Sequence, residues 1–301
     1  MKQNINILSA GGDRRFVILS RRLSSRNGTR VMTYGQGWLD PVVGSIFPHR
    51  LDRISELKQS PDILILPLPL TLDGETLSMP LEKGDEAVPP VSLTHLLDLC
   101  HPHTRVYCGL TPVAEGFKQL CKSRGLRLID YMEDEAFTLR NADATAEAAV
   151  SLAVTLLPVT MRGTRVLITG GGRIARSLTR LLTAMGAEVT LAARSAAART
   201  QAQLLGARAV PLGDLVTVLP SMRLVFNTIP APIFGKEEVG RIPANALTME
   251  LASNPGGFDL EALEEYRRPV VKALSLPGKT APESCAAWLE TLIAENEKDF
   301  I

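Results

Sequence analysis

Short apolar runs alternate along this chain with longer segments whose apolar positions recur at helical spacing. The run Ile63-Leu64-Ile65-Leu66 lies between two prolines, which is typical of a strand buried inside a parallel sheet. The pattern predicts strands at Ile5–Ser9, Arg30–Tyr34, Ile63–Leu66, Arg105–Cys108, Arg127–Asp130, Arg165–Thr169, Glu188–Ala192, Ala209–Val210, Arg223–Asn227, Ala246–Glu250 and Val270–Ala273. Strands that alternate with helices indicate an α/β fold with parallel sheets, rather than an all-α or all-β fold.

Two expected helices and one irregular segment organise the chain around these strands. Residues Asn141–Leu157 are rich in helix formers and stop at Pro158, so they predict a helix that bridges two halves. Near the C-terminus, apolar residues at helical spacing predict a closing amphipathic helix that returns to the first half; they are Cys285, Trp288, Leu289, Leu292 and Ile293. The segment Leu70–Pro90 is expected to be an irregular loop, a lid or an interface.

The length and composition fit two globular domains. The chain has 301 residues, of which 45% are hydrophobic, which is enough to bury two cores. We expect a first domain, flavodoxin- or Rossmann-like, at residues 1–140, which binds the substrate and is completed by the C-terminal helix 284–301. A bridging helix at 141–158 then leads to a second Rossmann-like domain at 159–283, which binds the nucleotide.

Composition also excludes several classes of protein. The longest apolar stretch, Ala148–Val159, is shorter than the roughly 18 to 20 residues of a membrane span, and the first residues contain no signal-peptide pattern, so a cytoplasmic protein is expected. The formal net charge of +1 argues against a nucleic-acid-binding protein. The four cysteines form no CxxC pair, which favours reduced thiols over a disulfide framework or a zinc ribbon.

The strongest motif follows the strand at Arg165–Thr169. It reads Gly170-Gly171-Gly172-Arg173-Ile174-Ala175, which satisfies G-x-G-x-x-A directly after a predicted strand and before a predicted helix. In a dinucleotide site, Gly170 makes the tight turn, Gly172 lets the backbone approach the pyrophosphate, and Ala175 keeps helix and strand close. The alternative is a structural turn that binds no nucleotide.

The end of the next strand indicates which dinucleotide would bind. An NAD site places an acidic residue about 20 residues after the glycines, but this chain has Arg194 and Ser195 there, followed by Arg199. These side chains suit a 2′-phosphate, so the sequence predicts NADP as the cofactor, with NAD as the alternative. The alternative is a solvated arginine on a loop.

Three more loops follow later strands, at the edge where ligands bind in open α/β sheets. Asn227-Thr228-Ile229-Pro230 follows one strand, and the amide of Asn227 with the neighbouring backbone is expected to border the nicotinamide. Glu250–Gly257 and Leu276–Pro282 follow the next two strands as loops rich in glycine and proline. From the residues alone, these last two loops are either functional or plain turns.

Taken in order, these segments resemble the family formed by the A subunits of dipicolinate synthase. The residues that carry the resemblance are Gly11-Gly12-Asp13 with Arg15, Thr145-Ala146-Glu147, the glycine loop with Ala192-Ala193-Arg194-Ser195, Asn227-Thr228-Ile229-Pro230, Leu251-Ala252-Ser253 with Pro255-Gly256-Gly257, and Leu276-Pro277-Gly278-Lys279 with Ala281-Pro282. The resemblance covers residues 140–285 well and the first 140 in patches.

The resemblance implies a two-domain fold like that of D-2-hydroxyacid and alanine dehydrogenases. The activity that it implies is the NADP-dependent oxidation of dihydrodipicolinate to dipicolinate in sporulating bacteria, together with a flavoprotein-like B subunit. A homo-oligomer is also expected. Two other functions stay open: an NADP-dependent dehydrogenase of another small carboxylate, similar to shikimate or alanine dehydrogenase, and a catalytically silent NADP-binding partner of another chain.

A small dicarboxylate substrate calls for cations and a base. Arg15 and Lys279 are candidates for binding its carboxylates, with Ser253 as a further contact and Lys279 also as a catalytic residue. Glu147 is a candidate catalytic residue or a surface carboxylate of the bridging helix. Asp13 is a candidate base or the cap of the following helix.

Overall fold

The computed structural model describes residues 5–37, 48–80 and 87–297. The chain folds into two compact units, one formed by Met1–Thr138 with Ala281–Ile301 and the other by Leu139–Thr280. The C-terminal segment therefore belongs to the same unit as the N-terminus. No helix in the described part of the chain is long and apolar enough to cross a membrane.

The first unit is built on a six-stranded sheet in the order β3-β2-β1-β4-β5-β6, in which all neighbours are parallel. Its strands are β1 (Ile5–Ala10), β2 (Thr29–Tyr34), β3 (His49–Leu51), β4 (Ile63–Ile65), β5 (Arg105–Cys108) and β6 (Arg127–Asp130). The order reverses between β1 and β4, which is the doubly wound arrangement of a Rossmann-like sheet.

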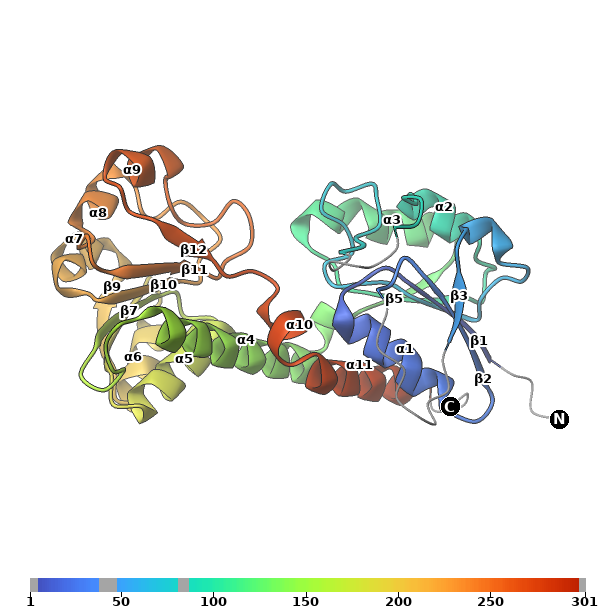
Figure 1. Ribbon diagram of the computed structural model, residues 1–301, viewed down its shortest axis with the longest axis horizontal. Helices are drawn as coiled ribbons and strands as arrows, with labels where there is room; N and C mark the ends of the chain where they lie inside the picture. The colour runs from blue at the N-terminus through green and yellow to red at the C-terminus, as the bar shows by residue number, and fades with distance from the viewer. Residues whose placement is uncertain (1–4, 38–47, 81–86, 298–301) are drawn as a thin grey trace. The chain divides into compact units, whose positions relative to one another are not determined.

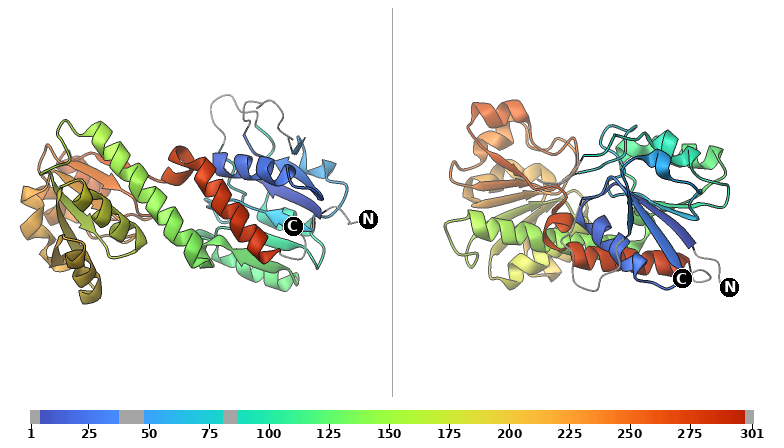
Figure 2. Two further views of the ribbon diagram at one scale, coloured as in Figure 1. Left: turned by 90° about the horizontal axis from the view of Figure 1, so that it is seen from below. Right: turned by 45° about the vertical axis from the view of Figure 1, so that its right-hand side comes forward.

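Helices cover both faces of this first sheet (Figure 1). The helices α1 (Arg14–Ser24) and α11 (Pro282–Asn296) share one core with one face, whereas α2 (Leu93–Asp98) and α3 (Glu115–Ser123) pack on the other. Short 3-10 helices lie at Ile54–Glu56, Pro112–Ala114 and Tyr131–Glu133. Figure 2 shows α11 running beside α1, although the two helices are far apart in the sequence.

The second unit repeats the same sheet order with its own strands. Its sheet is β12-β11-β10-β7-β8-β9, again parallel throughout, so the order reverses between β7 and β10. The strands are β7 (Arg165–Thr169), β8 (Glu188–Ala193), β9 (Arg208–Pro211), β10 (Leu224–Asn227), β11 (Leu247–Glu250) and β12 (Val270–Lys272).

The helices of the second unit also form two layers around their sheet (Figure 1). On one face lie α4 (Glu135–Leu156), α5 (Arg173–Ala184) and α6 (Ala196–Leu204). On the other lie α7 (Leu215–Val218), α8 (Lys236–Arg241) and α9 (Leu260–Glu265), while α10 (Leu276–Thr280) follows the last strand. Short 3-10 helices lie at Leu212–Asp214 and Leu219–Ser221.

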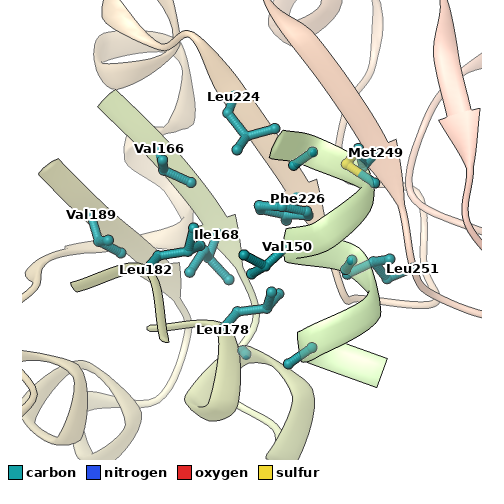
Figure 3. Packing of buried hydrophobic residues seen from close by; sticks show 14 of the residues in the cluster. Val150, Val166, Ile168, Leu178, Leu182, Val189, Leu224, Phe226, Met249 and Leu251 are labelled. Carbon is teal, nitrogen blue, oxygen red and sulfur yellow. The ribbon is translucent and has the colours of Figure 1, made fainter. Parts of the chain in front are cut away.

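Alternation along the central strand explains these two cores. In β7, Val166 and Ile168 face α4 and α5, whereas Leu167 faces the opposite layer. Val150 of α4 packs beside Ile168 and Phe226, as Figure 3 shows. Because both faces of the strand are covered, it reads as a continuous apolar run rather than an alternating one.

Each strand predicted from the sequence is present, and the predicted α/β class with two Rossmann-like parallel sheets is confirmed. One strand, β3, was not predicted, because it has only three residues and begins with two polar side chains, His49 and Arg50. The bridging helix begins at Glu135 rather than Asn141, since the carboxylate of Asp134 accepts a hydrogen bond from the N–H of Phe137 (2.6 Å).

The segment Leu276–Pro282 was predicted to be a loop, either functional or a plain turn, and its loop conformation was wrong. Leu276–Thr280 forms the short helix α10, in which Pro277 occupies the first turn. Proline is tolerated there because the first turn needs no backbone N–H donor. The closing helix is present and ends at Asn296, and the last four residues of its predicted range, 298–301, lie outside the described residues. Residues 81–86 of the Leu70–Pro90 segment lie outside them as well.

Candidate functional site

In the glycine loop between β7 and α5, the first two glycines are tightly packed and the third faces free space. Gly170 has a φ of +105°, and a Cβ there would lie 2.4 Å from the hydroxyl oxygen of Thr228. A Cβ on Gly171 would lie 2.4 Å from the Cβ of Ala198. A Cβ on Gly172 would meet nothing within 4 Å. The first two glycines are therefore required by the fold, and the third faces free space at the N-terminus of α5.

A pocket of about 520 Å³ opens at this loop. It lies at the carboxyl ends of β7, β8 and β10, where the strand order reverses and where open α/β sheets bind ligands. All three glycines line it, and so do four further residues predicted from the sequence: Arg194, Ser195, Thr228 and Pro230. The structure thus brings these predicted cofactor residues together in one cavity.

The end of the pocket beyond β8 is positive. Arg194 is exposed, and its side chain makes no hydrogen bond or ion pair with any described residue. Ser195 caps α6 by accepting a hydrogen bond from the N–H of Ala198 (3.4 Å). The described residues that line this pocket include no aspartate or glutamate. The cavity therefore lacks the carboxylate that would bind a ribose 2′-hydroxyl.

Sequence reasoning missed a second arginine in this pocket. Arg176 lies on the first turns of α5, and its Nε donates a hydrogen bond to the side-chain oxygen of Gln201 on α6 (2.8 Å). Gln201 also lines the cavity, so both members of this hydrogen-bonded pair border it. The signal was the spacing: Arg176 stands four residues after Gly172, one helical turn along from the loop.

Arg199, Ile174 and Arg173 do not line the pocket, although the sequence predicted them as cofactor residues. Arg199 donates from its Nη1 to the backbone oxygens of Ala193 (2.8 Å) and Arg194 (2.7 Å), so it holds the turn that presents Arg194. Ile174 packs partly buried against the apolar core of the sheet. Arg173 is exposed at the start of α5.

Asn227 is fully buried and is held by the protein itself. Its side-chain oxygen accepts from the hydroxyl of Thr169 (2.7 Å), and its Nδ2 donates to Glu250 (2.8 Å) and to the backbone oxygen of Ile229 (2.9 Å). The expected direct contact of this amide with nicotinamide is therefore not available. Asn227 instead fixes the backbone of Ile229, which lines the pocket.

Glu250 lies at the end of β11 as a buried carboxylate, 6% exposed. It accepts hydrogen bonds from the backbone N–H groups of Ala252 (2.9 Å) and Gly257 (2.7 Å) as well as from Asn227. A Cβ on Gly257 would lie 2.3 Å from the Nδ2 of Asn227, so only glycine fits there. The loop after β11 is thus wrapped around one carboxylate and is not a generic turn.

A second pocket, of about 610 Å³, runs along α9 and the edge strand β12, from the turn before β12 to the loop after β11. Glu250, Asn254 and Leu274 are among its lining residues. Neither predicted substrate residue is among its described lining residues: Ser253 precedes Asn254 in the chain, and the Nζ of Lys279 donates to the backbone oxygen of Leu274 (3.4 Å). Lys279 is exposed and stands on α10 rather than in a loop.

Arg15 does not lie open to a ligand within the first unit. It is 3% exposed, its Nε and Nη2 bind the carboxylate of Asp13 (both 2.8 Å), and its Nη2 also donates to the backbone oxygen of Leu68 (2.6 Å). Asp13 is the N-cap of α1, since its carboxylate accepts from the N–H of Arg15 (3.1 Å). The capping alternative for Asp13 is confirmed, and the two side chains neutralise each other.

The glycine pair before α1 is covered by another segment of the chain. It stands at the same position in its sheet as the glycine loop of the second unit, which is open. The N–H of Gly11 donates to the backbone oxygen of Tyr34 (2.7 Å) and that of Gly12 to the backbone oxygen of Ser78 (3.0 Å). A Cβ on Gly11 would lie 2.5 Å from that same oxygen of Ser78. The segment after β4 therefore covers this loop, and its N–H groups are not free for a phosphate.

Several charged side chains and one cysteine thiol of the first unit make structural rather than catalytic contacts. Arg26 pairs with Glu290 of α11 (2.8 Å), and Arg22 binds the same carboxylate, so part of the basic N-terminal segment anchors the last helix. Burial raises the pKa of the Cys285 thiol to about 11, which keeps it protonated and unreactive near neutral pH. Glu147 is exposed on α4.

Known proteins share both the sequence pattern and the fold of this chain. Residues 6–132 match the family model that describes the N-terminal domain of the A subunit of dipicolinate synthase. The A subunit of dipicolinate synthase from Bacillus subtilis (strain 168) is 25% identical over 295 residues, which is 98% of this chain and 96% of the relative. The chain is similar to that subunit over nearly its whole length. The resemblance inferred from the sequence is confirmed, and the family match falls in the part where that resemblance was only patchy.

Solved structures give the same fold. The crystal structure of the A subunit of dipicolinate synthase from Bacillus halodurans superposes with a TM-score of 0.85 at 23% identity and covers 98% of both chains. D-lactate dehydrogenase from Escherichia coli superposes with a TM-score of 0.62 at 13% identity, over 99% of this chain and 98% of that one. The fold is therefore the two-domain α/β fold found in dipicolinate synthase A chains, D-lactate dehydrogenase and alanine dehydrogenase.

Proposed function

We propose that this protein is an NADP-dependent oxidoreductase that converts dihydrodipicolinate to dipicolinate as one subunit of a synthase. The observation that carries the proposal is the pocket at the glycine loop, which is open at Gly172 and carries Arg194 where an NAD site has an acid. The similarity to the A subunit of dipicolinate synthase over 98% of the chain supports the reaction.

The residues of this pocket fit a dinucleotide. The free space beyond Gly172 and the backbone N–H groups at the start of α5 suit the pyrophosphate. The guanidinium of Arg194, with the hydroxyl of Ser195, suits a phosphate on the ribose 2′-oxygen. Thr228 and Pro230 border the side of the cavity next to β10, towards which the nicotinamide half would extend.

The oxidation removes a hydride and a proton from the dihydropyridine ring, and the gain of aromaticity supplies much of the driving force. When bound, an oxidised nicotinamide supplies the hydride acceptor. The chain itself binds and orients the two reactants. The hydrogen bonds from Asn227 to Glu250 and Ile229 hold the loops after β10 and β11 in fixed positions for that purpose.

The name of the relative denotes one subunit of a synthase, and we propose a flavoprotein-like B subunit as the partner, in the cytoplasm of a sporulating bacterium, with this chain as a homo-oligomer. Lys279 and Ser253 remain the proposed substrate contacts, and Lys279 and Glu147 the proposed catalytic residues. Arg15 and Asp13 are not retained, since they pair with each other.

An activity assay tests the function. Purified protein, alone and with the flavoprotein-like partner, should form dipicolinate and NADPH in equal amounts from dihydrodipicolinate and NADP⁺. NADPH binding without turnover in either mixture would overturn the proposed reaction and favour a catalytically silent partner chain. Turnover of alanine or shikimate in place of dihydrodipicolinate would favour a dehydrogenase of another small carboxylate.

A further inference from the structure

Two guanidinium groups line the pocket at the glycine loop, and they come from different elements. Arg194 directly follows β8, whereas Arg176 is the fourth residue of α5. Helix α6 contributes Ala197, Ala198 and Gln201 to the same cavity. Two of these three side chains are single methyl groups, which keeps room for a ligand group beside α6.

Arg176 has donors to spare. Its Nε donates to the side-chain oxygen of Gln201 (2.8 Å), and this is its one hydrogen bond to a residue that the structure describes. The two Nη atoms carry four further N–H groups. Arg194 is unpaired within the same described ranges, and no carboxylate is found among the described lining residues. The cavity therefore holds two cations whose charge the described protein residues do not balance.

The position of Arg176 does not serve the helix itself. The N-terminus of an α-helix carries partial positive charge, which favours acidic side chains in the first turn. Helix α5 has no acidic residue there, and Arg176 ends that turn. A cation at this place is unfavourable for the helix alone and becomes favourable when an anion binds beside it.

Two features direct the guanidinium of Arg176 towards the end of β8. Long side chains on a helix lean towards its N-terminus, which here is the glycine loop. The hydrogen bond to Gln201 draws the side chain towards α6, the helix that follows β8. In doubly wound dinucleotide sites the ribose 2′-position lies at the end of this second strand, whereas the pyrophosphate lies at the start of the first helix.

The charge of the ligand group also favours this end of the cofactor. A phosphate monoester carries a charge of about −1.5 to −2 near neutral pH and three acceptor oxygens, which two guanidinium groups can bind together. The nearby Arg199 donates to the backbone oxygens of Ala193 and Arg194 and does not line the pocket. Arg176 is therefore the lining residue that can supply the second cation.

We propose that Arg176 binds the 2′-phosphate of NADP together with Arg194, and that Gln201 is a positioning residue that holds the guanidinium of Arg176. This inference rests on the proposed function, because it assigns the selection of that function's cofactor to a further residue. Two elements, the end of β8 and helix α5, then share the recognition of one phosphate.

Titration of the full chain with NADPH and with NADH tests the proposal. Arg176→Gln should weaken NADPH binding by about tenfold and NADH binding by less than about twofold, because only NADPH carries the phosphate. Arg180→Gln is the matched control, one turn further along α5, where the side chain is exposed, pairs with Asp143 (2.8 Å) and does not line the pocket. It should change neither affinity.

Two outcomes would overturn the role of Arg176. An equal loss of NADPH and NADH affinity in Arg176→Gln would place this guanidinium on the pyrophosphate, and unchanged NADPH affinity would show that it binds no part of the cofactor. Arg176→Lys keeps the charge but not the planar fork of donors, so it should retain part of the preference for NADPH. Arg176→Gln should melt no lower than the unaltered protein, since a cation leaves the N-terminal turn of α5.

A double-mutant cycle tests the role of Gln201. Gln201→Met removes the acceptor and keeps the length of the side chain, so it should weaken NADPH binding by about threefold and leave NADH binding unchanged. In an Arg176→Gln background the same substitution should have no effect, because the side chain that it positions is absent. An equal loss of NADPH affinity in both backgrounds would contradict the positioning role.

The proposed function and this inference can fail separately. A protein that shows the expected pattern of nucleotide affinities but forms no dipicolinate, with or without its partner, contradicts the proposed reaction and leaves the role of Arg176 intact. Dipicolinate formation with a preference for NADPH that Arg176→Gln does not alter contradicts this inference alone. An unaltered protein that does not bind NADPH contradicts both.

Discussion

At the scale of single residues, the three glycines of the loop differ in what they do. Gly170 and Gly171 are required because neighbouring side chains leave no room for a Cβ. Gly172 has an ordinary extended backbone, with a φ of −78°, and faces free space. The fold would accept a side chain there, whereas the dinucleotide that we propose at this loop would not.

This difference leads to a prediction for the Gly172→Asp variant. Aspartate is a favourable N-cap, so the variant should unfold within about 0.5 kcal/mol of the unaltered protein or be slightly more stable. Its carboxylate would occupy the space for the pyrophosphate and repel it, so NADPH binding should weaken by at least about tenfold. Chemical denaturation and NADPH titration measure the two effects. Tight NADPH binding by this variant would contradict the location of the pyrophosphate.

Gly170→Ala is the matched variant with the opposite outcome. The positive φ and the contact with Thr228 should cost the fold roughly 2 kcal/mol or more. A Gly170→Ala protein as stable as the unaltered one would show that the loop is less tightly packed than the structure indicates.

At the residue scale, the sequence located the pocket at the glycine loop. It did not predict hydrogen bonds between residues that are far apart in the chain. The glycine pattern with Arg194 and Ser195 located the pocket because it is a local signal of spacing. The burial of Arg15 depends on Leu68, and that of Asn227 on Glu250. Such contacts arise only when strands far apart in the chain become neighbours in a sheet.

At the scale of elements, the last helix completes the first unit. Leu289 and Ile293 of α11 are buried with residues of α1, and Glu290 pairs with Arg26. Amphipathic spacing predicted this helix because its 15 residues span several turns. The three-residue strand β3 and the five-residue helix α10 are too short for any period to be visible.

The packing of α11 leads to a prediction for Leu289→Ala. Removing this fully buried side chain should destabilise the first unit by about 2–5 kcal/mol and leave NADPH affinity unchanged. Glu295→Ala, at an exposed position of the same helix, should change stability by less than about 0.5 kcal/mol. Thermal unfolding followed by tryptophan fluorescence measures this, and a Leu289→Ala protein of unaltered stability would contradict the packing of α11.

At the scale of the whole molecule, the two units have the same strand order, but the loops at the reversal of that order differ. In the second unit the loop at the reversal of strand order is open to solvent, whereas in the first it is closed by Ser78. The alternating pattern of the sequence predicted both sheets. It did not show which loop would be covered, because the covering segment is irregular and has no periodic signal.

A ligand should therefore stabilise the second unit selectively. NADPH at about 100 times its Kd should add about 2.7 kcal/mol to the unit that binds it. Both tryptophans, Trp38 and Trp288, fall within the sequence ranges of the first unit, so fluorescence follows that unit and circular dichroism follows both. We expect a circular dichroism transition to shift upward while the fluorescence transition shifts less. An equal shift in both transitions would contradict the selective stabilisation of the second unit.

The identity of the cofactor is the claim on which the proposed function depends most. The most direct measurement is a titration that compares NADPH with NADH in the unaltered protein and in Arg194→Asp. The unaltered protein should prefer NADPH by at least about tenfold, and the variant should lose or reverse that preference. An unchanged preference for NADPH in Arg194→Asp, or equal affinity for the two nucleotides in the unaltered protein, would contradict the assignment of Arg194 to the 2′-phosphate.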